Sequence, residues 1–371
     1  MAAALVLSLS AVAVSAAEPV QFTAAGAPRE LKGAPGVYEW RFEAKVGPSA
    51  YDRIAIHRIA KGPSPPAHPA IVMLYLPGTN MNGEVAIDDA RYSLPIYLAA
   101  NGVDVWAMDY RTHFVPADAT EAQLGELKDW TNGLFESDID AVARFILAQT
   151  HRDRIFLAGF SRGVTYEYLY AAMHPAVVKG IVVLDGFLPR HAFARAPSGQ
   201  VADDLGGPHL TFDKRQHLME MVIANPDQPA PIPKYKTARE NLEHVVYDAK
   251  DFGGKGGLAN PMGGFSDPVV LAHVLAAYDR WWPAVQNSED SFSPELLAAL
   301  KASKIPVLAF SSTNIASDWP SWVEESAHST SSSDVTVLKF PGAGHLDVLC
   351  GTRSEAEVYA PTLAWLRRHQ K

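Results

Sequence analysis

The sequence predicts an α/β fold built on a mostly parallel sheet. Continuous apolar runs, of the kind that form strands buried on both faces, recur along the chain, and amphipathic helical segments lie between them. The runs lie at 71–76, 103–108, 155–158, 181–184, 305–310 and 335–340. Strands that alternate with helices need crossover connections, which cover both faces of the sheet with helices.

Two further strands and one clear helix are predicted from periodicity. Segments 38–46 and 51–59 alternate large apolar with polar residues on either side of a Gly-Pro-Ser turn, which indicates an antiparallel hairpin. In the helix, Phe135, Ile139 and Val142 share one face at steps of three and four. The helix lies between two of the apolar runs, as an α/β alternation requires.

The regular alternation stops for more than a hundred residues after the sixth predicted strand. This stretch is rich in Gly, Pro, Asp and Lys and contains one strong helical pattern, at 268–282. Because sheet strands bracket it, we expect a cap over the strand ends at 188–300, inserted between core segments 38–187 and 301–371.

Composition and charge exclude several functions. Of the 371 residues, 32 are basic and 41 are acidic, which gives a net charge of -9, and no stretch is rich in Lys and Arg. This argues against nucleic acid or an anionic membrane surface as the main partner. The single cysteine, Cys350, can form no internal disulfide and no cysteine-based zinc site, and we expect neither a cofactor nor a metal.

The chain opens with an uncharged apolar run that ends in small residues. The run is shorter than the roughly 20 residues that span a bilayer, so we expect no integral membrane segment. We interpret residues 1–17 as a signal peptide and expect a secreted or periplasmic protein. The run lacks an N-terminal Lys or Arg, so an ordinary tail is the alternative interpretation.

The motif Gly-Phe-Ser-Arg-Gly at 159–163 follows a predicted strand and precedes a predicted helix. A G-x-S-x-G elbow needs this context, because its tight turn requires glycine at both flanking positions and lifts the serine hydroxyl above the strand ends. The helix N-terminus points its N–H groups at the same place. Ser161 is therefore a candidate nucleophile, and the alternative is a glycine turn with an inert serine.

An oxyanion hole next to this serine needs two backbone amides. One comes from the residue after the nucleophile, here Arg162, and the other from the loop after the third predicted strand. In that loop Thr79 is our first choice, because it follows a glycine that allows close backbone approach, and Asn80 is the second.

His345 is the candidate general base. It lies in a Gly-rich loop between the last predicted strand and the C-terminal helix, after the serine in the order that this architecture requires. We expect most other histidines, such as His57, His151 and His369, to be surface residues. His113, in the loop after the fourth predicted strand, is a candidate lining residue of the pocket.

From about residue 38 to the end, without the insertion, the chain resembles the α/β-hydrolase superfamily, and the serine elbow and the histidine loop carry the resemblance. Segments 102–111, 145–150 and 345–349 are similar to its acid-lipase branch. The resemblance implies an eight-stranded-type sheet with a cap after the sixth strand, and cleavage of carboxylic esters. Pro77 stands where the superfamily often has histidine, so a plain turn is the alternative for that loop.

The acid of a catalytic triad is where the sequence departs from the superfamily pattern. Most members place it after the seventh strand, where Ile315 occupies the aligned position. One candidate is Asp318, slightly later in that loop, which is otherwise a helix N-cap. The other is Asp185, at the end of the sixth predicted strand, where pancreatic-type lipases keep their acid; it is otherwise a carboxylate that bonds local amides. We favour Asp185, because a strand end fixes a carboxylate that must orient the histidine.

These residues predict a secreted serine hydrolase that cleaves small-molecule or lipid esters through an acyl-enzyme. Two alternatives remain open. In the first, the same triad cleaves an amide or transfers the acyl group. In the second, the chain is a non-catalytic binding module on a hydrolase scaffold, which only the displaced acid favours.

Overall fold

The computed structural model describes residues 20–188, 201–202, 211–247, 264–283, 285 and 293–371. The predicted signal peptide at 1–17 lies outside these ranges. A search of the described residues finds no helix long and apolar enough to cross a membrane.

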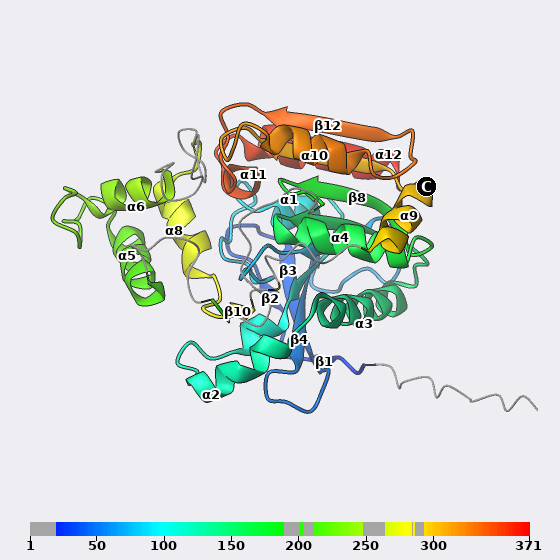
Figure 1. The fold of residues 1–371 in the computed structure, drawn as a ribbon, viewed down its shortest axis with the longest axis horizontal. Coiled ribbons are helices and arrows are strands. Elements are labelled where there is room, and N and C mark those ends of the chain that lie inside the picture. Colours follow the sequence, from blue (N-terminus) through cyan, green and yellow to red (C-terminus); the bar gives the residue numbers. More distant parts are fainter. Residues whose placement is uncertain (1–19, 189–200, 203–210, 248–263, 284, 286–292) are drawn as a thin grey trace, which may run out of the picture.

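A ten-stranded sheet forms the centre of the molecule (Figure 1). Its strands are β1 (Thr23–Ala24), β2 (Arg29–Glu30), β3 (Val37–Lys45), β4 (Arg53–Lys61), β5 (Val72–Leu76), β6 (Asp104–Asp109), β7 (Ile155–Phe160), β8 (Val178–Leu184), β11 (Val307–Ser312) and β12 (Val335–Phe340). A separate small sheet pairs β9 (Val201–Ala202) with β10 (Trp282–Pro283).

Helices and helical turns connect these strands. The helices are α1 (Leu94–Ala100), α2 (Glu121–Leu124), α3 (Asn132–Thr150), α4 (Arg162–Met173), α5 (Phe212–Ala224), α6 (Ala238–Tyr247), α8 (Pro268–Ala276), α9 (Pro294–Ala302), α10 (Trp319–Ala327), α11 (Asp347–Cys350) and α12 (Ala360–Arg368). The 3₁₀ turns are η1 (Arg111–Phe114) and η2 (Gly125–Asp129), and η4 (Glu355–Tyr359) is one turn of π-helix.

The strand order is β1-β3-β4-β6-β5-β7-β8-β11-β12, with β2 paired to β3. Strands β6, β5, β7, β8, β11 and β12 run parallel, whereas β3 and β4 pair antiparallel with each other and β4 pairs antiparallel with β6. Without the two-residue strands β1 and β2, the sheet has the eight strands expected, and β8 is the sixth of them in chain order. The predicted strands, hairpin and α/β class are confirmed.

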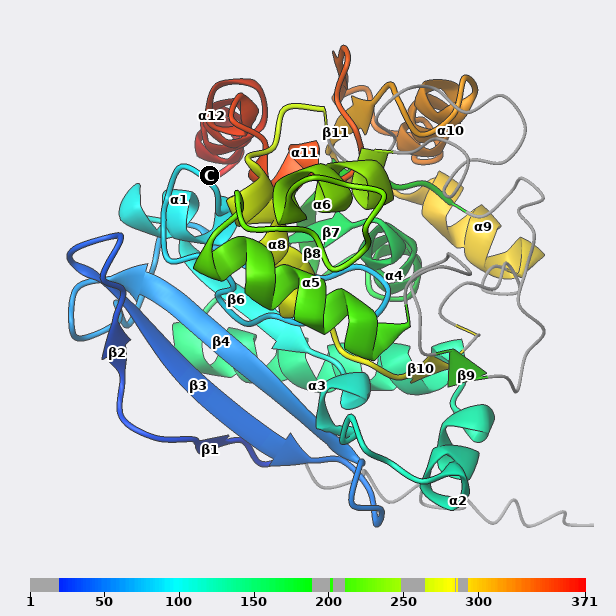
Figure 2. The same ribbon diagram turned by 90° about the vertical axis from the view of Figure 1, so that its left-hand side faces the viewer.

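Alternating side chains of each buried strand feed two apolar cores, one on each face of the sheet. On one face, Met73 and Tyr75 of β5 pack with residues of α1 and α12. On the other, Leu74 and Leu76 pack with residues of α3, α4 and α10. Figure 2 shows these two helical layers on opposite sides of the sheet. Two covered faces explain why the parallel strands are continuously apolar in sequence.

The segment between β8 and β11 leaves the sheet and contributes no strand to it in the part that the structure describes. Its helices α5, α6 and α8 pack together beyond the carboxyl ends of the parallel strands (Figure 1). The carboxyl edge of a parallel sheet is where such folds place their ligands, so these helices border the expected site. The exact cap boundaries, 188 and 300, remain a prediction.

The helix predicted at 268–282 is shorter than expected, since α8 ends at Ala276. Two interactions draw the following residues out of the helix. The amide of Asp279 donates to the Asn80 carbonyl oxygen at 2.8 Å, and β10 then pairs with β9. Both partners are distant in sequence, so periodicity alone extended the helix too far.

Candidate active site

Ser161 occupies a sharp turn between β7 and α4. Its backbone angles, φ 53° and ψ -115°, lie outside the regions that a residue with a side chain ordinarily adopts. Such backbone costs roughly 1–3 kcal/mol and persists only where the surroundings enforce it. The packing around this turn is tight enough to enforce it. A Cβ on Gly163 would lie 2.0 Å from the Leu76 carbonyl oxygen, and a Cβ on Gly159 would lie 2.4 Å from the Gly163 carbonyl oxygen. Backbone contact therefore requires both glycines of the motif.

Residues 77–83, called loop 77–83 below, follow β5 and lie against the serine. A Cβ on Gly78 would come within 3.1 Å of the Ser161 Cβ. Thr79, the next residue, is partly exposed, whereas Asn80 is 1% exposed. The candidate oxyanion amide of Thr79 thus belongs to a backbone segment packed beside the nucleophile.

Arg162 is the first residue of α4, so its amide lies at the N-terminus of this helix, directly after the serine. The guanidinium points elsewhere. Its Nη2 donates to Asn132 Oδ1 at 2.5 Å and to the Val285 carbonyl oxygen at 3.1 Å, and the group lies over the ring of Tyr166. The side chain of Arg162 therefore has structural contacts, and its amide is the group at the turn.

His345 and Asp185 form a hydrogen-bonded pair. The distance from Nδ1 to Oδ2 is 2.6 Å, the carboxylate is fully buried, and 12% of the histidine side chain is exposed. With a carboxylate on Nδ1, that nitrogen carries the proton and Nε2 is the acceptor. The imidazole ring stacks on Phe160, the residue before the serine, at a centroid distance of 4.5 Å.

Neutral donors complete the surroundings of Asp185. The Ser312 amide donates to Oδ1 at 2.6 Å and its hydroxyl to Oδ2 at 2.8 Å, while the Trp319 indole donates to Oδ1 at 2.9 Å. The Trp319 ring also packs edge-on against His345, with the ring centroids 5.7 Å apart. A network with several donors on one carboxylate holds it in a single orientation.

The structure places the other acid candidate away from the histidine. Asp318 is exposed at the N-terminus of α10, where its carboxylate accepts from the Ser317 hydroxyl at 3.3 Å. It makes no side-chain cap for this helix. Among the described residues, Asp185 is the carboxylate hydrogen-bonded to His345, so the geometry favours Asp185 and sets Asp318 aside.

The segment after α8 anchors loop 77–83. Besides the backbone bond described above, Asn80 Nδ2 donates to the Asp279 carbonyl oxygen at 3.2 Å. Asn82 Nδ2 donates to the Ala277 carbonyl oxygen at 2.8 Å and to Asp279 Oδ1 at 3.0 Å. Loop 77–83 is therefore held by residues nearly two hundred positions later in the chain.

Histidines and carboxylates continue from Asp279 into the sheet. His113 Nδ1 lies 3.0 Å from Asp279 Oδ1, and its Nε2 lies 3.8 Å from Asp109 Oδ2. His57 lies between Asp109, at 2.9 Å, and Glu39, at 2.7 Å. Burial alone would lower the pKa of each histidine, but the carboxylates outweigh it and raise the pKa of His57 to about 10 and that of His113 to about 9. Both rings are therefore cations at neutral pH.

The expectation that His57 is a surface residue is wrong. Its side chain is only 4% exposed, because β4 lies between β3 and β6 and carboxylates from both neighbours enclose the ring. His113 does not line the cavity described below. Instead it contacts Asp279, the residue that anchors loop 77–83.

Sequence reasoning missed four residues of this arrangement: Asp109, Asp279, Ser312 and Trp319. Asp109 could have been identified from the sequence, because it is a carboxylate at the end of a buried strand. Trp319 and Asp279 carry none, since their partners lie 134 and 166 residues away in sequence. Within the described ranges, no group of three or more His, Cys, Asp or Glu residues is placed to hold a metal ion.

Comparisons with known proteins give structural matches. No family model and no curated protein matches the chain. A candidate lipase of known structure from Sulfolobus solfataricus is 26% identical, with a TM-score of 0.77, and the match covers 94% of this chain and 99% of that one. An esterase from Thermogutta terrifontis is 15% identical (TM-score 0.48, 89% and 99% covered), and an α/β-hydrolase fold protein from Nakamurella multipartita is 16% identical (TM-score 0.45, 86% and 97% covered).

The first of these matches covers nearly the whole chain, and this chain has the strand order, a strained serine between β7 and α4, and a histidine after β12. On these grounds the chain has the α/β-hydrolase fold, and the match to the Sulfolobus protein supports membership of the α/β-hydrolase superfamily.

Proposed function

We propose that this protein hydrolyses carboxylic esters through an acyl-enzyme formed on Ser161. The observation that carries the proposal is the 2.6 Å bond between His345 Nδ1 and the buried Asp185, in a fold that presents Ser161 on a strained turn. A buried carboxylate on one imidazole nitrogen is the arrangement that makes the other nitrogen an effective base.

The proposed reaction has two halves. His345 Nε2 takes the proton of the Ser161 hydroxyl as its oxygen attacks the ester carbonyl carbon, and returns that proton to the leaving alcohol. Water then attacks the acyl-enzyme with the same histidine as base, which releases the acid and restores the serine. The amides of Thr79 and Arg162 donate to the oxygen that becomes negative in each half.

One structural match favours an ester substrate. The Sulfolobus protein, which matches nearly the whole chain, is described as a candidate lipase. The rigid anchoring of loop 77–83 to Asp279 further supports a preorganised amide at Thr79, since oxyanion donors act by being fixed before the reaction.

The test is hydrolysis of a panel of chromogenic esters of increasing acyl length by the wild type and by Ser161→Ala. We expect the substitution to lower kcat by about 10³-fold or more with the fold retained, because nothing else in the site attacks the carbonyl. Ser317→Ala, an exposed serine near the site, is the matched control and should leave turnover unchanged. Equal turnover by Ser161→Ala would contradict the proposal.

The same panel separates the alternatives. Cleavage of the matched anilides at a rate comparable to the esters indicates an amidase, and transfer to an added alcohol in place of water indicates an acyltransferase. Binding of the esters without turnover by the wild type indicates a non-catalytic module.

We also propose export, on the apolar run at 1–17. N-terminal sequencing of protein recovered outside the cytoplasm should find a chain that begins near residue 18. A full-length chain confined to the cytoplasm would contradict export without bearing on the reaction.

A further inference from the structure

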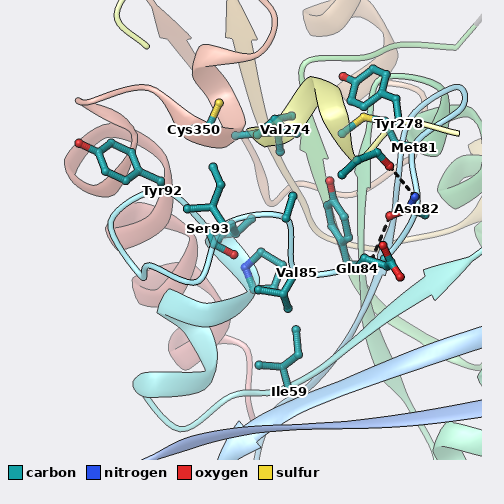
Figure 3. Close-up of a pocket in the computed structure, with 18 residues that line it drawn as sticks. Ile59, Met81, Asn82, Glu84, Val85, Tyr92, Ser93, Val274, Tyr278 and Cys350 are labelled. Atoms are coloured by element: carbon teal, nitrogen blue, oxygen red, sulfur yellow. Dashed lines mark hydrogen bonds between the residues drawn. The ribbon is translucent and has the colours of Figure 1, made fainter. Parts of the chain in front are cut away.

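A cavity of about 90 Å³ lies behind loop 77–83 (Figure 3). Met81 and Asn82 of this loop form one wall, Tyr278 and Val274 another, and Tyr92 and Cys350 lie across from them. The cavity is small beside the roughly 300–1,000 Å³ of pockets that take drug-sized ligands, so it has room for part of a molecule such as one chain.

Three segments that build the candidate active site also line this cavity. Met81 contributes to its wall, and its sulfur would lie 3.2 Å from a Cβ on Gly78, which itself packs against Ser161. Cys350 belongs to α11, which starts two residues after His345. Tyr278 immediately precedes Asp279, the anchor of loop 77–83. Gly78 thus lies between Ser161 on one side and Met81, in the wall of this cavity, on the other.

The walls are mainly apolar, with Ile59, Val85, Ile87, Leu94 and Leu349 among the lining residues. Such walls suit an aliphatic chain, since its burial is favourable by about 25 cal/mol for each Å² removed from water. Hydrocarbon alone does not account for the whole lining, however, because two tyrosines also face the cavity.

Tyr75 and Tyr278 are each only 6% exposed, and among the described residues no protein group hydrogen-bonds either hydroxyl. Buried hydroxyls normally have a partner. The neighbouring Tyr110 follows that rule, because its hydroxyl donates to the Pro77 carbonyl oxygen at 3.1 Å. Burial raises the pKa of both cavity tyrosines above the usual value of 10, so each stays a neutral O–H donor.

We infer that this cavity binds the acyl chain of the ester and that the Tyr75 and Tyr278 hydroxyls donate to an oxygen within that chain. The preferred substrates are therefore esters whose acyl chain carries an ether, keto or hydroxyl oxygen, ahead of plain alkanoates of the same length. This inference rests on the proposed function, because it places the acyl carbonyl at Ser161.

The experiment compares isosteric 4-nitrophenyl esters. One is the heptanoate, and three others replace a single CH₂ of the same chain by an ether oxygen, at the fourth, fifth or sixth chain atom. In the wild type we expect kcat/KM for at least one ether chain to exceed that for heptanoate by about 3- to 10-fold, the worth of one or two hydrogen bonds. Equal or lower values for all three ethers would overturn the inference.

Tyr75→Phe and Tyr278→Phe remove the donors one at a time, with Tyr51→Phe, a buried tyrosine of the other apolar core, as the matched control. We expect the ratio of kcat/KM for the preferred ether ester to kcat/KM for the heptanoate to fall toward 1 in at least one of the two variants. The ratio should stay at its wild-type value in the control. Turnover of 4-nitrophenyl acetate should stay unchanged in the Tyr51→Phe control. Both variants should fold normally, because each loses a hydroxyl that has no partner. A preference that persists in both would overturn the inference.

Binding to Ser161→Ala separates this inference from the proposed function. Calorimetric titration with heptanamide and with the ether amides needs no turnover. Tighter binding of an ether amide, lost in Ser161→Ala/Tyr75→Phe or Ser161→Ala/Tyr278→Phe, supports the cavity assignment even if the wild type hydrolyses no ester. Equal binding of all amides, or none, overturns it even if the acetate is hydrolysed.

Discussion

Two histidine–carboxylate assemblies support the site, and they differ in the number of carboxylates that each ring meets. His345 has one, Asp185 on Nδ1, and the other groups around that carboxylate are neutral donors. His57 has two, with Glu39 on one nitrogen and Asp109 on the other. The second arrangement keeps its ring cationic, whereas the first leaves one nitrogen of the ring available to accept a proton.

This difference suggests a catalytic role for His345 and a structural role for His57. A histidine hydrogen-bonded by a carboxylate at each nitrogen has no lone pair left to act as a base, so we assign His57 to stability. Its partner Asp109 also accepts from the Gly83 amide at 2.7 Å and thus reaches loop 77–83. His113 reaches the same loop through Asp279. One assembly therefore serves the proposed base and the other holds the loop with the proposed oxyanion amide.

The largest expected effect is that of Asp185→Asn on turnover. The amide cannot accept the Nδ1 proton as a carboxylate does, so we expect kcat on an activated ester to fall roughly 10³- to 10⁴-fold. Asp318→Asn is the matched control, because the sequence alone left both aspartates open, and it should retain wild-type kcat. The opposite pattern, with Asp318→Asn inactive, would reverse the assignment of the acid.

The next effect is on stability. Asp109→Asn leaves the buried His57 cation with one carboxylate and weakens the bond to Gly83, so the free energy of unfolding should fall by about 3–5 kcal/mol in a denaturant titration. The Asp185→Asn variant should lose less, because it breaks no contact with a permanent cation. If Asp109→Asn unfolds like the wild type, the proposed division of roles is wrong.

The pH dependence of stability should follow the second assembly. Its folded pKa values, about 10 for His57 and about 9 for His113, lie above the 6.5 of an unperturbed histidine. The folded chain therefore binds more protons, so this contribution is complete below pH 6.5 and is lost as the pH rises through 9 and 10. Unfolding free energies at pH 6, 8 and 10 should decline less steeply in His113→Gln than in the wild type. Parallel declines would show that His113 does not carry the effect.

The smallest effect is that of Trp319→Phe. The variant keeps a ring against His345 but loses the indole bond to Asp185, so we expect kcat to fall by about 3- to 10-fold, with KM and stability nearly unchanged. Trp322→Phe, on the same helix, is the control. A kcat equal to the wild type would show that Ser312 alone orients Asp185.

Local patterns made much of this predictable. The buried strands carry continuous apolar runs, and the elbow glycines sit where any side chain would strike backbone, so the fold and the place of Ser161 follow from sequence. His345 follows from chain order after the last strand.

What the sequence did not predict depends on contacts between distant residues. The sequence favoured Asp185 but left Asp318 open, and the Ser312 and Trp319 donors that distinguish them meet Asp185 only in the folded sheet. His57 resembled a surface residue because β4 alternates with polar residues on one side. The carboxylates that bury it come from strands 18 and 52 residues away.

Covalent labelling tests the central claim most directly. A fluorophosphonate probe reacts only with a serine activated by a base, and mass spectrometry of the digested protein locates the adduct. We expect one adduct, on Ser161, formed by the wild type and by Asp318→Asn and His57→Gln, and formed at least 10²-fold more slowly by His345→Gln. An adduct on another residue, or labelling of Ser161 at the same rate in His345→Gln, would contradict the account.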